Sequence, residues 1–182
     1  MFSNDFKSIL PIEKDDLRVC LFTLDDISER YIGWLNNKEL VRFSNQRFMN
    51  HDEASCREFF DSVSRSNSVF LAVKHNVHGH IGTMTIHFNQ RHGTADMGIL
   101  IGETSVPGAG STAWLMVMDK VLSLSGVRKI TAGTLSCNKA MLGVIRKSDM
   151  PNTNYLVADC SLRQGAGGTK FARFGSRPCF LR

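Results

Sequence analysis

Three short runs of apolar and β-branched residues occupy the middle of the chain, at residues 69–74, 81–88 and 95–101. Runs of this kind, bounded by turn-forming residues, are typical of β-strands. The connections between them, residues 75–79 and 89–93, are short and contain Asn, His and Gly. Because short connections join antiparallel neighbours, the pattern predicts a three-stranded antiparallel meander.

Apolar residues at helical spacing predict two helices before the meander. The apolar face of the first consists of Ile27, Tyr31, Trp34 and Leu35. The second is expected to begin near Asn50, whose side chain can cap the helix while Glu53 reaches back. A run at residues 18–24 predicts a strand ahead of the first helix.

After the meander the pattern changes again. A glycine-bearing turn at residues 106–110 leads into a predicted helix at 111–125, and then come a predicted strand at 128–135 and a helix from Asn138 to Lys147. Two further strands are expected in the tail, at 155–160 and 170–174. We therefore predict an α/β (α+β) fold with a central mixed, mostly antiparallel sheet of six to seven strands, flanked by about four helices.

Composition places the chain among ordinary globular proteins. It has 182 residues, of which 42% are hydrophobic and 21% charged, and this excludes disordered, collagen-like and disulfide-scaffold proteins. With no long linker, repeat or low-complexity tract, we expect one domain over residues 1–182. The longest apolar run, 113–118, is too short to span a bilayer, so we expect no membrane partner.

The start of the chain has no basic segment followed by an apolar one, so no secretory signal is expected. The five cysteines form no C-x-x-C pair, and reduced thiols in a cytoplasmic protein are the expectation. The formal charge is +5 overall but +9 over residues 120–182. A basic segment can serve nucleic acid or a phosphorylated ligand, but aromatic interleaving is absent, so nucleic acid is not expected as a partner.

The turn before the helix at 111–125 suits a phosphate group. Gly108 and Gly110 let the backbone turn sharply and approach a ligand closely. The first N–H groups of the following helix have no intrahelical acceptor and carry partial positive charge, so turn and helix together can cradle a pyrophosphate.

Four segments stand out in the longer stretch from Ala95 to Lys147: A-D-M-G-I-L-I-G at 95–102, P-G-A-G at 107–110, R-K-I-T-A-G at 128–133 and N-K-A at 138–140. In these segments and their order the chain resembles the GNAT N-acetyltransferase superfamily, in particular the branch of ribosomal-protein-alanine and amino-sugar acetyltransferases. It covers about residues 17–150, whereas 151–182 diverge. It implies acetyl-CoA as the acyl donor, with no metal.

The resemblance also implies positions for the donor. Backbone groups of Leu100 and Ile101 would contact the pantetheine, where the fourth and fifth strands splay apart, and Asn138 would hydrogen-bond the same arm. The pyrophosphate would lie at the turn and helix start, which comprise Gly108, Ala109, Gly110, Ser111, Thr112 and Ala113. A backbone N–H near Leu100 would polarise the thioester carbonyl.

Asp96 is the leading candidate for the catalytic base, because related proteins often place an acidic residue there facing the acceptor. The alternative is a strand-edge carboxylate paired with an arginine. Glu103 and His87 are further candidates for the base, with Glu103 favoured as a loop surface group and His87 as a substrate-binding or structural residue. Arg47 could meet an acceptor phosphate or carboxylate, or lie as a surface arginine.

Some residues depart from the family pattern. Pro107 and Thr112 replace the usual residues of the turn, and Met141 and Ile145 stand where the family often has a Ser or Tyr serving the leaving thiolate. An N-acetyltransferase is expected, with a catalytically silent CoA-binding module as the alternative. The acceptor is expected to be a small amine, with an amino sugar or sugar nucleotide favoured over a protein N-terminus. The oligomeric state, a homodimer included, stays open.

A metal site formed by His75, His78 and His80 is not expected, because no cysteine or acid completes the set.

Overall fold

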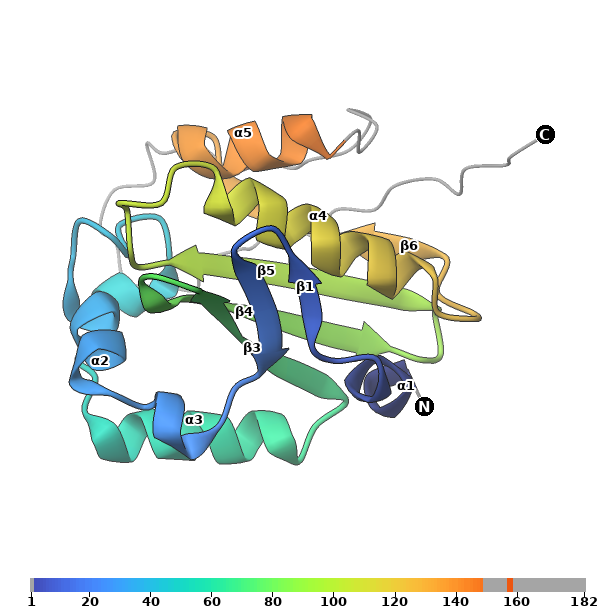
Figure 1. Cartoon of the computed structure of the whole chain (residues 1–182), viewed down its shortest axis with the longest axis horizontal. Coiled ribbons are helices and arrows are strands. Elements are labelled where there is room, and N and C mark those ends of the chain that lie inside the picture. The colour runs from blue at the N-terminus through green and yellow to red at the C-terminus, as the bar shows by residue number, and fades with distance from the viewer. Residues whose placement is uncertain (1, 149–156, 159–182) are drawn as a thin grey trace.

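A computed structural model describes residues 2–148 and 157–158 of the chain (Figure 1). In chain order the elements are α1 (Phe2–Ser8), β1 (Ile12–Lys14), β2 (Leu17–Leu21), the 3₁₀ helix η1 (Leu24–Asp26), α2 (Glu29–Asn36), the 3₁₀ helix η2 (Asn45–Phe48), α3 (Glu53–Ser64), β3 (Ser68–His75), β4 (Gly79–Asn89), β5 (Thr94–Ile101), α4 (Ala109–Leu122), β6 (Lys129–Thr131), β7 (Thr134–Leu135), α5 (Lys139–Lys147) and β8 (Val157–Ala158). None of the described helices is long and apolar enough to cross a bilayer.

Six strands form one mixed sheet in the order β1-β2-β3-β4-β5-β6. All neighbours are antiparallel except β5 and β6, which run parallel. β7 and β8 form a separate parallel pair. The predicted fold class and the meander of β3, β4 and β5 are confirmed.

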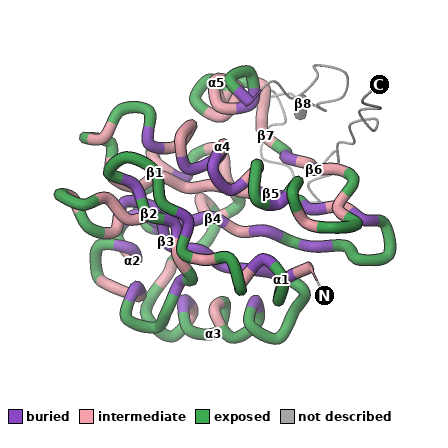
Figure 2. Tube along the Cα trace, turned by 45° about the vertical axis from the view of Figure 1, so that its right-hand side comes forward, coloured by how far each residue is buried: buried purple, intermediate pink, exposed green. Residues whose placement is uncertain are grey.

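Two layers of helices enclose the sheet (Figures 1 and 2). On one face, α1 and α4 bury a core centred on Phe6, Trp114 and Val117, to which alternate β5 residues such as Met97 contribute. On the other face, α2 and α3 pack Tyr31, Trp34 and Cys56 around Phe22 and Phe70. Successive strand residues point to opposite faces, so Asp96, Gly98 and Leu100 lie on the α2–α3 side.

The structure differs from the predictions at several boundaries. The described residues include α1, which is too short to show a clear helical period and makes five α-helices where about four were expected. Asp52, rather than Asn50, caps α3, because its carboxylate accepts the Ser55 N–H at 2.8 Å while Ser55 Oγ accepts the Asp52 N–H. The strand predicted at 128–135 divides into β6 and β7.

The tail and the cysteines give mixed outcomes. β8 falls within the first predicted tail strand, and the second lies outside the described residues. Cys20 and Cys56 are free thiols, but Cys137 is disulfide-bonded, so the expectation of reduced thiols is wrong at that position.

Candidate active site

β5 and β6 separate partway along their length. They pair over three positions, of which Asp96 opposite Thr131 is the last. β5 then continues to Ile101, whereas β6 ends at Thr131. In the described part of the chain, no strand pairs with residues 97–101 along this edge. The fork that the family resemblance implied is therefore present, and its free backbone groups can hydrogen-bond an extended ligand.

A row of four polar side chains crosses the sheet at the fork. Ser68, His87, Asp96 and Thr131 occupy directly opposed positions on β3, β4, β5 and β6. Thr131 Oγ1 donates to Asp96 Oδ2 at 2.6 Å, and Ser68 Oγ lies 2.7 Å from His87 Nδ1. Asp96 and His87 are exposed, whereas Ser68 is buried. The strand register thus brings together two candidate residues that the sequence could only name separately.

The buried hydroxyl of Ser68 favours one tautomer of neutral His87. Among the described residues His87 Nδ1 is the hydrogen-bond partner of Ser68 Oγ, so the hydroxyl is best satisfied by donating to that nitrogen. Neutral His87 then carries its proton on Nε2 and acts as a donor on the exposed face. Asp96, which can only accept while ionised, is therefore the group in this pair that suits a base.

The turn ahead of α4 has the geometry that its glycines predict. Gly108 caps the helix with φ +84°, in the left-handed region that favours glycine. A Cβ on Gly110 would lie 3.2 Å from Ile101 Cγ1, so the helix start packs closely against the end of β5. Ala109 and Ala113 are buried in the core, and the Ala109 N–H already donates to the Val106 carbonyl at 3.3 Å, so neither alanine offers a free donor through its side chain or first-turn amide. Ser111 and Thr112 are partly exposed.

Asn138 is the N-cap of α5. Its Oδ1 accepts the Met141 N–H at 3.1 Å, and the cap does not use its NH₂ group, which can donate to a ligand. Helix α5 lies beside α4 (Figure 1), so Asn138 and the glycine turn belong to neighbouring helices.

Arg47 makes its described contacts within its own loop. Its Nη1 donates to the Arg42 carbonyl at 2.7 Å, and its guanidinium lies 4.4 Å from the centroid of the Phe48 ring. None of these contacts involves the polar row. Arg47 lies in η2, next to α2, and its role in binding the acceptor stays a prediction.

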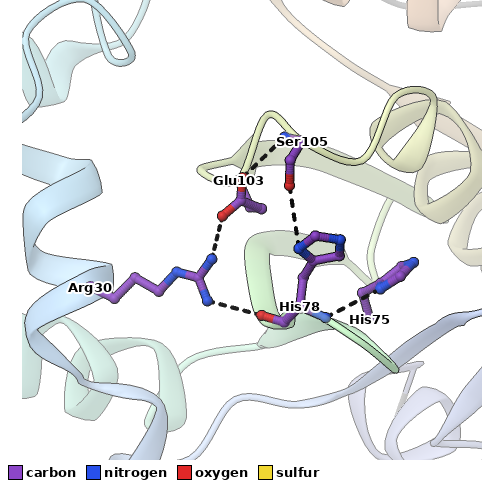
Figure 3. A network of polar contacts seen from close by, with 5 residues as sticks. All are labelled: Arg30, His75, His78, Glu103 and Ser105. Atoms are coloured by element: carbon purple, nitrogen blue, oxygen red, sulfur yellow. Dashed lines mark hydrogen bonds and ion pairs between the residues drawn. The ribbon is translucent and has the colours of Figure 1, made fainter.

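Glu103 is not arranged as a base. It forms an ion pair with Arg30 of α2 and accepts the Ser105 N–H at 3.0 Å (Figure 3). Hydrogen bonds from Ser105 and Arg30 lower the pKa of Glu103 to about 2. A carboxylate this weakly basic does not take a proton from an ammonium group. Of the two interpretations of Glu103, a loop surface group fits the structure better than a catalytic base, although the side chain has a definite partner in Arg30.

The three histidines of the H-x-x-H-x-H motif do not gather at one point: the rings of His75 and His78 lie 5.0 Å apart, whereas His80 lies among aromatic side chains. His80 packs against Phe22, Tyr31 and Trp34, and its Nε2 lies 2.9 Å from the Gly82 carbonyl. Burial lowers the pKa of His80. His80 is therefore a core residue, and no group of three metal-ligating side chains occurs among residues 2–148.

Sequence reasoning missed Ser68, Thr131 and Arg30. Each is an ordinary residue in its local pattern, and only its partner across the sheet or on another element gives it a role. Thr131 stands within the conspicuous R-K-I-T-A-G segment, which is the one local signal that could have pointed to it.

Comparisons with known proteins agree with this geometry. Residues 16–151 match the family model described as "Acetyltransferase (GNAT) domain". No curated protein matches the sequence significantly.

Solved structures share the fold at low identity. Spermidine N-acetyltransferase from Vibrio cholerae, in complex with CoA and spermine, superposes with a TM-score of 0.69 at 13% identity, covering 89% of this chain and 94% of that one. The ribosomal L7/L12 α-N-protein acetyltransferase RimL, in complex with CoA, has a TM-score of 0.69 at 12% identity, covering 91% and 95%. The microcin C7 self-immunity acetyltransferase MccE, with acetyl-CoA and AMP, has a TM-score of 0.65 at 11% identity, covering 75% and 79%.

Proposed function

The chain belongs to the GNAT acetyltransferase family, and from this premise we propose that it moves an acetyl group from acetyl-CoA to the primary amine of a small acceptor. The observation that carries the proposal is the fork between β5 and β6, whose free edge continues through the loop of residues 102–108 to a glycine-capped helix. We take residues 1–182 as one N-acetyltransferase-like domain, with its motifs in about 17–150.

The residues at the fork fit acetyl-CoA. The backbone of Leu100 faces β4, whereas the alternate residues Ile99 and Ile101 turn their N–H and C=O groups to the free edge, where they can hydrogen-bond the amides of the pantetheine arm. The first-turn N–H groups of Gly110 and Ser111 face outward from the helix start and suit a pyrophosphate. The free NH₂ group of Asn138 can donate to a carbonyl of the same arm. Bound acetyl-CoA supplies the activated thioester.

Asp96 is the proposed catalytic base. Its carboxylate lies at the vertex of the fork, fixed there by Thr131. Asp96 takes the proton from the acceptor ammonium, directly or through water, and so frees the nitrogen lone pair. The nitrogen then forms a bond to the thioester carbon, the carbon–sulfur bond breaks, and the thiolate departs with its electron pair. The nitrogen, which became positively charged on forming the new bond, loses its second proton to water, so that a neutral amide is left. A backbone N–H beside Leu100 that faces the free edge, that of Ile99 or Ile101, donates to the carbonyl oxygen as charge develops there.

A dedicated acid for the thiolate is not part of this mechanism. Ile145 is buried in the core and has no proton to give, and Met141 has none either. A thiol has a pKa of about 8.5, so the thiolate can leave unprotonated near neutral pH. The catalytically silent CoA-binding module is the second candidate function, and the observation that favours it is that neither Met141 nor Ile145 can donate a proton.

The acceptor is proposed to be an amino sugar or sugar nucleotide, with a protein N-terminus as the alternative. The exposed pair of His87 Nε2–H and the Asp96 carboxylate offers a donor and an acceptor for hydroxyl and amino groups side by side. Arg47 can bind an acceptor phosphate through the part of its guanidinium that does not contact Arg42. Spermine and AMP in the complexes of the similar structures differ from each other, so they do not select an acceptor.

Two measurements test the proposal in sequence. Isothermal titration with acetyl-CoA should give saturable binding, and absence of heat at millimolar concentration would refute the donor. Release of free thiol is then followed with glucosamine phosphates, an amino-sugar nucleotide, spermidine and a peptide with a free N-terminal alanine. Turnover with the glucosamine phosphates or the amino-sugar nucleotide supports the favoured acceptor. Binding of acetyl-CoA without turnover of any of these amines supports the catalytically silent module instead.

A further inference from the structure

The loop between β5 and α4, residues 102–108, joins the free strand edge to the glycine cap. It starts with the N–H groups of Gly102 and Glu103, which both donate to the Ile81 carbonyl, at 2.9 and 3.1 Å. Gly102 lies flat against the ring of Trp34, where a Cβ would overlap the indole. The first two residues of the loop are therefore fixed by β4 and α2.

The rest of this loop is held mainly through one carboxylate (Figure 3). One oxygen of Glu103 pairs with Arg30 Nη2 on α2, and the other accepts the Ser105 N–H at 3.0 Å. The second Arg30 nitrogen, Nη1, donates to the His78 carbonyl at 2.9 Å. Ser105 Oγ lies 3.3 Å from His78 Nδ1. In the part of the chain that the structure describes, Glu103 and Ser105 supply the polar side-chain contacts from this loop to other elements.

The charges in this arrangement persist at physiological pH. The pKa of Glu103 is lowered to about 2 by its hydrogen bonds from Ser105 and Arg30, and a guanidinium does not deprotonate in proteins. The Arg30 guanidinium also lies 5.6 Å from the centroid of the Trp34 ring, a cation–π contact that restricts it further. Two residues one turn apart on α2 thus hold the loop, Trp34 by packing and Arg30 by pairing.

We propose that Arg30, Glu103, Ser105 and His78 form a positioning network that holds the β5–α4 loop in the shape needed to bind the acetyl-CoA pyrophosphate. The inference rests on the proposed function, because it assigns the network to the donor site. None of the four side chains needs to touch the donor. They act by removing alternative loop conformations before binding, which reduces the entropy cost of ordering the loop around the ligand.

The size of the effect follows from exposure. Arg30 and Glu103 keep 43% and 23% of their side-chain surface in water, so the network is screened and its loss should be moderate. We expect Glu103→Gln to weaken acetyl-CoA binding by about five-fold. It removes the ion pair, so the loop of the free protein can adopt other conformations that binding must then exclude. The KM for acetyl-CoA should rise by the same factor, while kcat at saturating donor should stay within about two-fold of the wild type.

The experiment compares Glu103→Gln and Arg30→Lys with Glu53→Gln, which breaks another exposed ion pair, Arg57–Glu53 on α3. Titration calorimetry gives the dissociation constant of CoA, steady-state kinetics separates KM from kcat, and amide hydrogen exchange of the free protein reports on residues 104–110. Both network variants should bind CoA more weakly and exchange faster in this segment. Arg30→Lys should weaken CoA binding less than Glu103→Gln does, because lysine keeps the positive charge and loses only the two-pronged geometry of the guanidinium. Glu53→Gln should change nothing.

Equal CoA affinity and equal exchange in Glu103→Gln and wild type would overturn the network. A fall in kcat with an unchanged KM would also overturn it, because the effect would then lie on the chemical step. If the wild type itself binds no CoA, the proposed function fails and the pyrophosphate assignment with it. The exchange measurement still decides then whether these side chains hold the loop.

Discussion

Thr131 Oγ1 donates a hydrogen bond of 2.6 Å to Asp96 Oδ2 at the last position where β5 and β6 are paired. The carboxylate is therefore held at the point where the sheet opens, on the face of the sheet that α2 and α3 partly cover. On its other side Asp96 has His87 as its cross-strand neighbour. The Thr131 hydrogen bond restricts the carboxylate rotamer, as the proposed role of Asp96 as a base requires.

Replacing Asp96 by Asn should lower kcat by about 10²- to 10⁴-fold, because a positioned base contributes a factor of that size. Acetyl-CoA affinity should be unchanged, since the proposed donor contacts lie on the backbone and at α4. Thiol release measures kcat, and titration calorimetry measures the affinity. Thr131→Val, which keeps the carboxylate but removes its hydrogen bond, should lose at most about ten-fold. Full activity of Asp96→Asn would exclude Asp96 as the base.

Replacing His87 by Ala should raise the acceptor KM by up to about ten-fold, the cost of one lost hydrogen bond, with a smaller change in kcat. Ser68→Ala should have a weaker effect in the same direction, because His87 loses its hydrogen bond to the Ser68 hydroxyl. His92→Ala is a suitable control, since His92 lies exposed in the β4–β5 turn. If His87→Ala and His92→Ala have equal acceptor KM values, His87 does not bind the acceptor.

Gly110→Trp should abolish acetyl-CoA binding. The new side chain has no room between α4 and Ile101, where even a Cβ would lie 3.2 Å away, so the helix start must move. Gly108→Ala is a milder second variant, because a left-handed conformation costs a residue with a Cβ about 1–2 kcal/mol. Gly133→Ala, with open space around it, serves as the control. Retained binding in a folded Gly110→Trp protein would disprove the cradle.

Gly102→Ala should destabilise the protein by about 1–3 kcal/mol, since the added methyl group overlaps the Trp34 ring and one of them must shift. Gly143→Ala should do the opposite, because Gly143 lies in α5 with open space around it and alanine favours a helix by about 0.5–1 kcal/mol. Urea unfolding measures both free energies. A neutral Gly102→Ala would mean that Trp34 moves aside at no cost.

Asp26→Asn should lower the free energy of unfolding at pH 7 by about 1–3 kcal/mol, as expected when one partner of a partly buried pair is removed. Asp26 is buried, which opposes ionisation, but hydrogen bonds from Lys74 Nζ, at 2.7 Å, and the Thr23 N–H outweigh this and lower its pKa.

A lowered pKa in the folded state stabilises the protein above the ordinary carboxyl pKa of about 3.9, and the contribution is lost as the pH falls through the lower value. The difference between wild type and Asp26→Asn should therefore be full at pH 7 and should shrink below about pH 4. Urea unfolding at pH 7 and pH 3 tests this, and a difference independent of pH would contradict it.

Much of the framework could be predicted from local patterns. Residues 69–74, 81–88 and 95–101 are apolar and β-branched enough to specify strands, and β3, β4 and β5 contain all three. The apolar face of α2 is buried as its spacing predicts, at Tyr31, Trp34 and Leu35. The glycine turn and the helix after it stand out because glycine is required where φ is positive, at Gly108. These signals act over a few residues, and a sequence displays them directly.

Local patterns do not specify which residues meet across the fold. The Asn50 cap was wrong because Asp52, two residues on, forms the better reciprocal pair with Ser55. The proximity of Asp96 to His87 and Thr131 depends on strand register, which the whole core fixes and a shift of one residue would reverse. Arg30 and Glu103 are 73 residues apart in the chain, and their pairing depends on α2 packing near the end of β5.

The sequence by itself therefore determined the elements, the family resemblance and the types of residue available for chemistry. Tertiary structure decided which carboxylate lies between a histidine and a threonine at the fork and which is paired with an arginine. The physical reason is that periodicity and turn chemistry are local, whereas the ionisation and orientation of a side chain depend on partners that packing brings from distant parts of the chain.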